Sequence, residues 1–396
     1  MRSVEEHQRI VAALITPRQP VDVAIGDALG LVLAADLVAP LSLPGFDNSA
    51  MDGYAVFAED VIGASLDSPV KLVVAEDIPA GRTDPLVLEP GTAHRIMTGA
   101  PLPAGATAVI PVEATDGATD TVAIMATATA GQHFRRAGED VTAGTTVLQA
   151  GQVLTPAALG LAAALGLGEL KVVPRQRVLV ISTGSELVSP GTPLQPGQIY
   201  ESNAVMLAAA VRDAGADVVT SSMTEDDVDV FRAELQMHAR DADLIITTGG
   251  VSAGAYEVVK DALTGAGVDF VKVAMQPGMP QGAGVVDGTP IITLPGNPVS
   301  ALVSFEVFIR SPLRAAMGLP RPDRTRMVAM LQDDLTSPRG RRQFRRGVLT
   351  GTTVTSFGPP ASHHLRWLAS ANCLLEIDED VVEVLAGSSV RVWDLT

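Results

Sequence analysis

The sequence predicts a multidomain α/β plus β protein, in which a doubly wound α/β domain is joined by a β-rich second domain and an all-β C-terminal domain. The chain has 396 residues, which is too long for one compact domain at roughly 100–200 residues per domain. Strand-like and helix-like segments alternate over residues 177–318. Residues 40–150 and 324–396 instead contain short apolar runs broken by turn residues. Together these three observations predict the fold class.

The N-terminal part is predicted to contain two short helices and many strands. Residues 4–15 place Val4, Ile10, Val11, Leu14 and Ile15 roughly on one helical face. The Val, Leu and Ile runs of residues 40–150 are broken by Gly, Pro, Asp and Thr, which is typical of strands joined by turns. A short Ala/Leu helix is expected at residues 157–166. We therefore predict a linker and helical domain (residues 1–40 and 141–175) and a β-rich domain (residues 41–140).

Residues 176–319 are predicted to form the α/β domain. The expected strands are RVLVIS, DVVTSSM, DLIITTGG, DFVKVAM and TPIITLPG. Helices are expected at residues 203–214 (with Asn203 as the N-cap), 228–240, 256–264 and 299–317. Strands that alternate with helices of this length favour a parallel sheet. Prolines at 320 and 322 then mark a linker to the all-β domain, residues 320–396.

The composition limits the function classes. The net charge of −17 argues against nucleic acid and anionic membrane as partners. One cysteine, Cys373, excludes an internal disulfide and a cysteine-rich metal site. The first residues carry two glutamates and no apolar signal core, and no stretch of about 18 apolar residues occurs. We predict a cytoplasmic protein.

Three turns should lie together at the carboxyl edge of the predicted sheet, where open α/β sheets bind ligands. Each combines glycine with hydroxyl or amide groups, and a helix begins soon after it, as at many anion sites. The alternative is that each is an ordinary tight turn. No P-loop and no GxGxxG motif follows the first strand. The turns contain Thr183, Gly184, Ser185 and Glu186; Gly249, Gly250 and Ser252; and Pro295, Asn297 and Pro298.

Two further segments carry candidate chemistry. Residues 337–347 hold five arginines within eight positions, Arg339, Arg341, Arg342, Arg345 and Arg346. Arginine suits bidentate binding of an oxyanion, but a solvated basic hairpin is an equal alternative, and the following His363 and His364 have no third metal ligand at useful spacing. In residues 43–56, Asp47 and Asp52 could either form Asx turns or hold Mg²⁺ through water.

Six segments together resemble the MoeA / gephyrin E-domain family across nearly the whole chain. They are GFDNSAMDGYA, RIMTGAPLPAGATAVI, ISTGSEL, GQIYESNA, TTGGVSAG and LPGNPVSA. The resemblance implies a MoaB/MogA-like molybdopterin-binding α/β domain within an elongated homodimer. It implies a molybdopterin molybdenumtransferase that takes molybdate and adenylylated molybdopterin, uses Mg²⁺, and releases molybdenum cofactor and AMP.

The family's functional positions carry over residue by residue. The resemblance implies catalytic and metal-binding roles for Asp52, Glu186 and Asp227, the last from an acidic pair with Asp226, and a catalytic role for Thr98. It implies that molybdopterin and anions contact the three turns. Outside the turns, the implied contacts are Lys272, Arg346 and Ser362. The chain departs from the family where many members have KPGKP, because Gln276 and Met279 replace two lysines, and where Glu257 replaces an aspartate.

A second function of a different class is also implied. Gephyrin-like members act as dimeric scaffolds that bind short peptides of membrane receptors or tubulin-like cytoskeletal (cell-division) proteins. A peptide groove would be expected near the C-terminal domain, with Phe344, Leu365, Trp367 and Leu368 as candidates that are more often core residues. Molybdopterin adenylyltransferase and molybdenum apo-enzymes are further partners consistent with the resemblance. The enzyme is favoured because Asp52, Thr98 and the other matched site residues are present.

Overall fold

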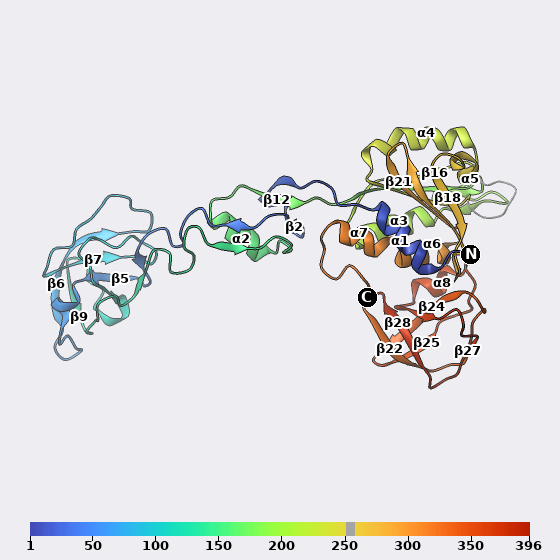
Figure 1. Cartoon of the computed structure of the whole chain (residues 1–396). Helices are drawn as coiled ribbons and strands as arrows, with labels where there is room; N and C mark the ends of the chain where they lie inside the picture. The colour runs from blue at the N-terminus through green and yellow to red at the C-terminus, as the bar shows by residue number, and fades with distance from the viewer. Residues whose placement is uncertain (251–257) are drawn as a thin grey trace. The chain divides into compact units, whose positions relative to one another are not determined.

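The computed structural model describes residues 1–250 and 258–396, which form two compact units (Figure 1). The first unit comprises residues 1–22, 30–34 and 171–396, and the second comprises residues 23–29 and 35–170. Each unit has its own sheets and its own buried hydrophobic core. The finer division into four domains stays a prediction.

The first unit contains a six-stranded sheet in the order β16-β13-β17-β21-β20-β18. The first four strands of this order are parallel, whereas β20 pairs antiparallel with both β21 and β18. The strands are β13 (Arg177–Thr183), β16 (Asp217–Thr224), β17 (Leu244–Thr248), β18 (Val268–Lys272), β20 (Pro280–Val286) and β21 (Thr289–Leu294). The predicted parallel sheet therefore contains one antiparallel strand, β20, that was not predicted.

Strand β20 was missed because its glycines hide the strand pattern. A Cβ on Gly282 would lie 2.3 Å from Thr293 Oγ1, and a Cβ on Gly284 would lie 2.1 Å from the Gly267 carbonyl oxygen. Neighbouring strands approach so closely here that only glycine fits. The sequence PQGAGVV therefore reads as a loop although it pairs along its length.

Helices cover both faces of this sheet, which confirms the doubly wound fold (Figure 1). Alternate residues of β13 serve the two layers: Val178 and Val180 pack in one core, and Leu179 and Ile181 pack in the other. One layer holds α1 (Val4–Leu14), α3 (Asn203–Asp213), α6 (Pro298–Ser304) and α7 (Arg310–Ala316). The other holds α4 (Val228–His238) and α5 (Val258–Leu263).

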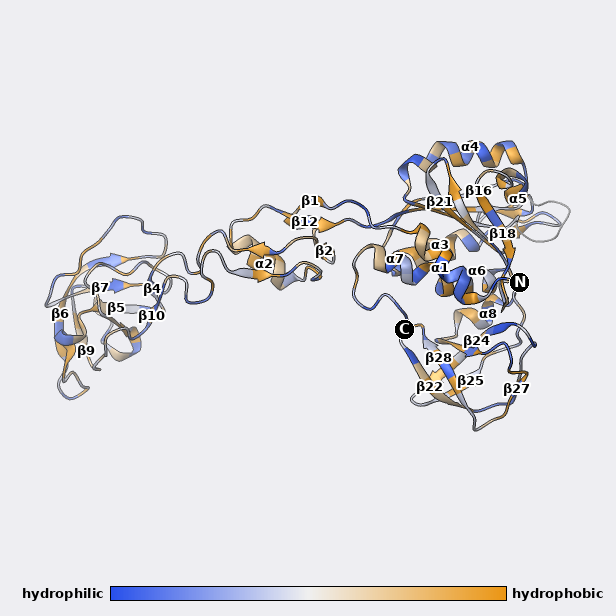
Figure 2. Ribbon diagram, viewed as in Figure 1, coloured by the Kyte–Doolittle hydropathy of each residue, from blue (hydrophilic) through white to orange (hydrophobic). Residues whose placement is uncertain are grey.

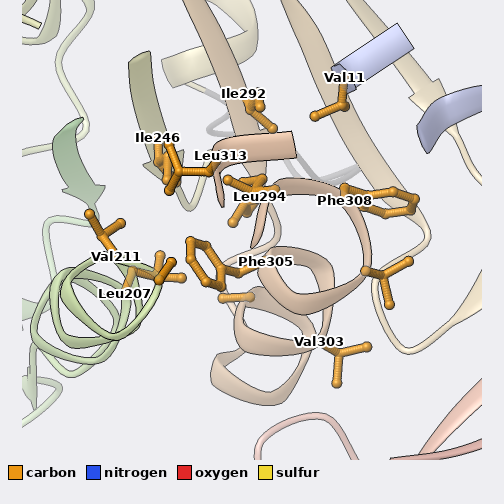
Figure 3. Packing of buried hydrophobic residues seen from close by; sticks show 14 of the residues in the cluster. Val11, Leu207, Val211, Ile246, Ile292, Leu294, Val303, Phe305, Phe308 and Leu313 are labelled. Atoms are coloured by element: carbon orange, nitrogen blue, oxygen red, sulfur yellow. The ribbon is translucent and has the colours of Figure 1, made fainter. Parts of the chain in front are cut away.

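The predicted helix over residues 299–317 is present but irregular. A π-helical turn, η5 (Phe305–Ile309), separates α6 from α7. Two large side chains of this turn, Phe305 and Phe308, are fully buried in the core. Figure 3 shows Phe305 pointing towards Leu207 of α3.

The C-terminal part of the first unit is a closed β-barrel, in agreement with the predicted all-β domain. The strands run β24-β25-β22-β28-β26, and β26 pairs back with β24. The short strand β19 (Met275–Gln276) adds to β24 and so joins the barrel to the α/β part. The barrel elements are β22 (Arg326–Leu331), β23 (Leu335–Thr336), β24 (Arg342–Thr350), β25 (Thr353–Ser356), α8 (Leu365–Ala369), β26 (Cys373–Ile377), β27 (Glu383–Val384) and β28 (Ser389–Asp394).

The second unit is β-rich with little helix, as the sequence predicted. Its five-stranded sheet has the order β8-β5-β7-β6-β9, and Tyr54, Ile110 and Val122 lie in its core. Figure 2 shows both hydrophilic and hydrophobic residues along the strands of this unit. Its elements are β3 (Leu37–Val38), β4 (Asn48–Ser49), β5 (Gly53–Val56), β6 (Val70–Ile78), β7 (Thr92–Ile96), β8 (Ala108–Pro111), β9 (Thr121–Ile124), β10 (Phe134–Arg135), β11 (Thr146–Leu148) and α2 (Pro156–Ala164).

The remaining strands are short. They are β1 (Val21–Ala24), β2 (Val32–Leu33), β12 (Glu169–Val173), β14 (Leu187–Val188) and β15 (Ile199–Tyr200). Among the residues that the structure describes, no helix has the length and apolar character needed to cross a lipid bilayer.

Candidate active site

A cavity of about 600 Å³ lies at the carboxyl edge of the α/β sheet, and all three predicted turns contribute to it. Ser252 belongs to residues 251–257 and lies outside the described residues. Pro295 and Ser185 support the turns from behind the cavity wall. The predicted residues that line the cavity are Thr183, Gly184, Glu186, Gly249, Gly250, Asn297 and Pro298.

The turns meet because glycine allows their backbones to touch. Gly249 has a φ of +94°, and a Cβ there would lie 2.5 Å from the Thr183 carbonyl oxygen. A Cβ on Gly296 would lie 3.3 Å from the Cα of Gly249. A side chain at Gly249 would therefore separate the first turn from the second.

Polar side chains behind the turns form a connected network. Thr248 Oγ1 donates to the Pro295 carbonyl oxygen at 3.0 Å. Asn203 Nδ2 donates to Thr248 Oγ1 at 3.1 Å and to the Gly296 carbonyl oxygen at 2.6 Å. Asn203 thus holds the second and third turns together. Its predicted role as N-cap was wrong, because Ser202 occupies that position and the Asn203 amide points to the turns.

Glu201 is a cavity residue that the sequence reasoning did not select. Its side chain is buried, and its Oε1 accepts hydrogen bonds from Ser182 Oγ at 2.8 Å and from the Ala204 backbone N–H at 2.6 Å. It therefore caps the first turn of α3 in place of Asn203. Its position within GQIYESNA, a segment that had carried the family resemblance, was the available signal.

The two aspartates that follow β16, Asp226 and Asp227, make different contacts. Asp226 lines the cavity, and its Oδ2 accepts the Ser185 backbone N–H at 3.1 Å while Ser185 Oγ accepts the Asp226 N–H at 3.0 Å. Asp227 instead caps α4, because its Oδ1 accepts the N–H groups of Asp229 and Val230 at 2.9 and 3.0 Å. Asp226 therefore faces the cavity, and the Asp227 carboxylate is occupied in the helix cap.

The predicted cationic ligands do not line the cavity. Lys272 is exposed at the end of β18. Arg346 is 3% exposed and donates to the carbonyl oxygens of Pro359, Ala361 (3.3 Å) and His364 (3.0 Å). Burial lowers the pKa of Arg346, and the neighbouring Arg345 lowers it further. The guanidinium thus organises the loop of residues 359–364.

That loop is fixed against the third turn. The Ser362 carbonyl oxygen accepts the Val299 N–H at 3.0 Å, at the start of α6. His363 and Leu365, which follow Ser362, line the cavity. Ser362 therefore lies beside the site and anchors it through its backbone.

Gln276 and Met279, which stand where many family members have lysines, make uncharged contacts. Gln343 Nε2 donates to Gln276 Oε1 at 3.0 Å, beside the pairing of β19 with β24. This amide pair links the α/β part to the barrel. The Met279 carbonyl oxygen accepts a hydrogen bond from the Val273 N–H at 2.8 Å, so this contact involves only the Met279 backbone.

Asp52 and Thr98 come together in the second unit. The Thr98 backbone N–H donates to Asp52 Oδ1 at 2.7 Å, and this hydrogen bond, with a further one from the Thr98 side chain, holds the pKa of Asp52 below its usual value. Asp47 has other partners, since it accepts the Ala137 N–H at 2.8 Å and pairs with Arg136 at 2.6 Å. The two aspartates therefore do not share one set of contacts.

The cavity presents carboxylates of the kind that can bind Mg²⁺. Among residues 1–250 and 258–396, no three His, Cys, Asp or Glu side chains form a complete metal site. Mg²⁺ needs no such cage, because it is usually held by one or two carboxylates together with substrate oxygens and water. Glu186 and Asp226 supply two carboxylates at the cavity.

Three family models match the chain. They are the MoeA N-terminal region (domains I and II) at residues 2–166, the probable molybdopterin binding domain at residues 179–315, and the MoeA C-terminal region (domain IV) at residues 328–395. The second match contains most of the cavity.

Similar proteins cover the whole chain. It is 70% identical to molybdopterin molybdenumtransferase 2 of Mycobacterium tuberculosis over 100% of both chains, and 38% identical to molybdopterin molybdenumtransferase 1 of that organism over 99% and 98%. The crystal structure of a molybdopterin biosynthesis MoeA protein from Pyrococcus horikoshii matches with a TM-score of 0.80 and 31% identity, covering 100% and 99% of the two chains. The chain therefore belongs to the MoeA family of molybdopterin molybdenumtransferases.

Proposed function

We propose that this chain inserts molybdenum from molybdate into adenylylated molybdopterin, giving molybdenum cofactor and AMP. The observation that carries the proposal is the cavity formed by three glycine turns and two carboxylates within the region that matches the molybdopterin-binding model. Relatives named as molybdopterin molybdenumtransferases support it over the full chain length.

The roles of the cavity residues follow from their contacts. The turns with Thr183, Gly184, Gly249 and Gly250 present backbone and hydroxyl groups that suit a pterin phosphate. Mg²⁺ would be held by Glu186 and Asp226, where it would neutralise charge on the phosphoanhydride. Glu201 and Asn203 position α3 and the turns. Ser185 fixes the Asp226 carboxylate towards the cavity.

Other parts of the proposal rest on the family resemblance. They are the catalytic roles of Asp52 and Thr98, the homodimer, the cytoplasmic location, and the partnership with an adenylyltransferase and molybdenum apo-enzymes. The scaffold alternative gains no support from the described residues or from the relatives compared.

Reconstitution with adenylylated molybdopterin, molybdate and Mg²⁺ tests the proposal, with AMP release and activation of a molybdenum apo-enzyme as the readouts. Asp226→Asn should lower turnover at least about tenfold, because a metal-facing carboxylate loses its charge. Asp227→Asn is the comparison, because Asp227, to which the resemblance assigned this role, caps α4 and asparagine also caps helices well. A folded wild-type protein without turnover at high molybdate would contradict the proposal. Equal losses in both variants would contradict the assignment of Asp226.

A further inference from the structure

We propose that the imidazole of His363 contacts the anionic group of the ligand, as the positively charged partner that the cavity otherwise lacks. This inference rests on the proposed function and assigns a binding residue within that site. It starts from the charge of the cavity wall, which includes the carboxylates of Glu186, Glu201 and Asp226.

The wall contains one side chain that can become a cation. Among the described residues that line the cavity there is no lysine or arginine, and His363 is the sole histidine. Residues 251–257 contain no Lys, Arg or His in their sequence. The cations expected here are elsewhere: Lys272 is on β18, and Arg346 donates to three carbonyl oxygens.

The backbone carbonyl groups around His363 accept several hydrogen bonds. The preceding carbonyl, of Ser362, accepts the Val299 N–H at 3.0 Å. The His363 carbonyl itself accepts the Leu365 N–H at 3.1 Å. Arg346 ties the same loop to the barrel. A loop fixed in this way delivers its side chain to one place, which lowers the entropy lost on binding.

The ring of His363 is also limited in orientation. It packs edge-to-face against the ring of His364, with 4.3 Å between centroids and an interplanar angle of 74°. The side chain stays exposed on the cavity side. Among the described residues, the ionisable groups that line the cavity with His363 are the three carboxylates and Tyr200, and the His364 ring contacts it.

The chemistry suits a phosphate or molybdate oxygen. An imidazolium donates a charge-assisted hydrogen bond to an oxyanion. The neighbouring carboxylates of Glu186 and Asp226 would bind a cation and repel a bare anion. One cationic group beside them can therefore hold an anion that arrives with Mg²⁺, and it can do so without the two family lysines.

Isothermal titration of the full-length protein with AMP in the presence of Mg²⁺, and separately with molybdate, tests the inference. His363→Gln should weaken AMP binding about tenfold at pH 6, the size expected for one charge-assisted hydrogen bond. His363→Lys should restore binding to within about twofold of wild type and hold that affinity at pH 8, since lysine stays charged. The AMP phosphate also changes charge between pH 6 and pH 8. The affinity of His363→Lys at the two pH values measures that contribution, which is then subtracted from the change seen with the wild type.

His238→Gln is the matched control and should bind AMP as the wild type does, because His238 lies at the end of α4 and does not line the cavity. Thermal unfolding of each variant verifies folding. Equal affinity of wild type and His363→Gln at both pH values, or a His363→Lys variant as weak as His363→Gln, would overturn the inference. If the wild type bound neither AMP nor molybdate, the proposed function would fail and this inference with it; binding by wild type with no effect of the substitutions would sink the inference alone.

Discussion

The glycine turns of the α/β sheet and the arginine-rich segment that includes strand β24 of the barrel were both candidate anion sites, and the structure uses them differently. The turns border an open cavity. The arginines of β24 are occupied by the protein: Arg342 pairs with Glu5 and Glu379, and Arg345 donates to Ser356 Oγ at 2.8 Å. Arg346 donates to three carbonyl oxygens. The number of cations in a segment therefore says little about how many are free to bind a ligand.

The largest effect is expected from Gly249→Ala, which would break the contact between the turns. Alanine there would meet Thr183 at 2.5 Å and must also adopt a φ of +94°. We expect a loss of about 2–5 kcal/mol in the free energy of unfolding, from the left-handed backbone and the overpacking together. The affinity for AMP should fall more than about tenfold, because the two turns that form this part of the cavity wall would move apart. Urea unfolding and titration calorimetry measure the two effects.

Gly191→Ala separates the two causes. Gly191 has a φ of +92°, but a Cβ there would meet nothing within 4 Å. It should therefore lose about 1–2 kcal/mol from the backbone conformation alone and keep AMP binding. Identical losses in the two variants would show that the close approach to Thr183 does not matter.

A loss of about 2–4 kcal/mol in the free energy of unfolding is expected from Arg346→Met, because the buried Arg346 side chain would no longer donate to three carbonyl oxygens of the loop. Arg339→Met is the control, since Arg339 is exposed and no partner for it occurs among the residues the structure describes. AMP binding by Arg346→Met should weaken only as the loop of residues 359–364 loosens. Unchanged stability with lost binding would instead support Arg346 as a direct anion ligand.

The same comparison shows which features the sequence can predict. Strand and helix order in the α/β part followed from periodicity, because buried strands such as RVLVIS are continuous apolar runs. The place of the turns followed from the rule that parallel strands end at one edge. Strand β20 did not follow, since its glycines reflect close approach of neighbouring strands, which only the fold creates.

Side-chain assignments were harder to predict than the position of the cavity. Asp226 and Asp227 are adjacent, and only the start of α4 decides that the second becomes a cap. Neither Glu201 nor His363 was selected as a cavity residue from the sequence, and tertiary contacts with Ser182 and with the third turn make them cavity residues. Arginine partners such as the carbonyls of residues 359–364 likewise exist only once the loop is folded.

The smallest of these effects concerns a basic side chain that is neither paired nor at the cavity. His7 of α1 is fully buried, and neither ring nitrogen has a hydrogen-bond partner among the described residues. Its ring packs edge-to-face on Phe308 at 4.7 Å between centroids. Burial lowers the pKa of His7 to about 4, with a further lowering from the charge of Arg2 against an opposing effect of Asp269. The folded state therefore holds His7 neutral where the unfolded chain would protonate it.

The sign of the pH effect follows from this depressed pKa. An unfolded histidine titrates at about 6.5, so between that value and the folded pKa of about 4 the proton binds only to the unfolded state. Stability from His7 is complete above about pH 6.5 and is lost as the pH falls towards 4. Between pH 7.5 and pH 5 the wild type should lose about 2 kcal/mol more than His7→Leu. Urea unfolding at both pH values measures this difference, and the two proteins should behave in parallel from pH 7.5 to 9. An equal loss of unfolding free energy in both proteins on acidification would show that the His7 ring is hydrated or paired. His7 would then not differ from the hydrogen-bonded arginines of β24.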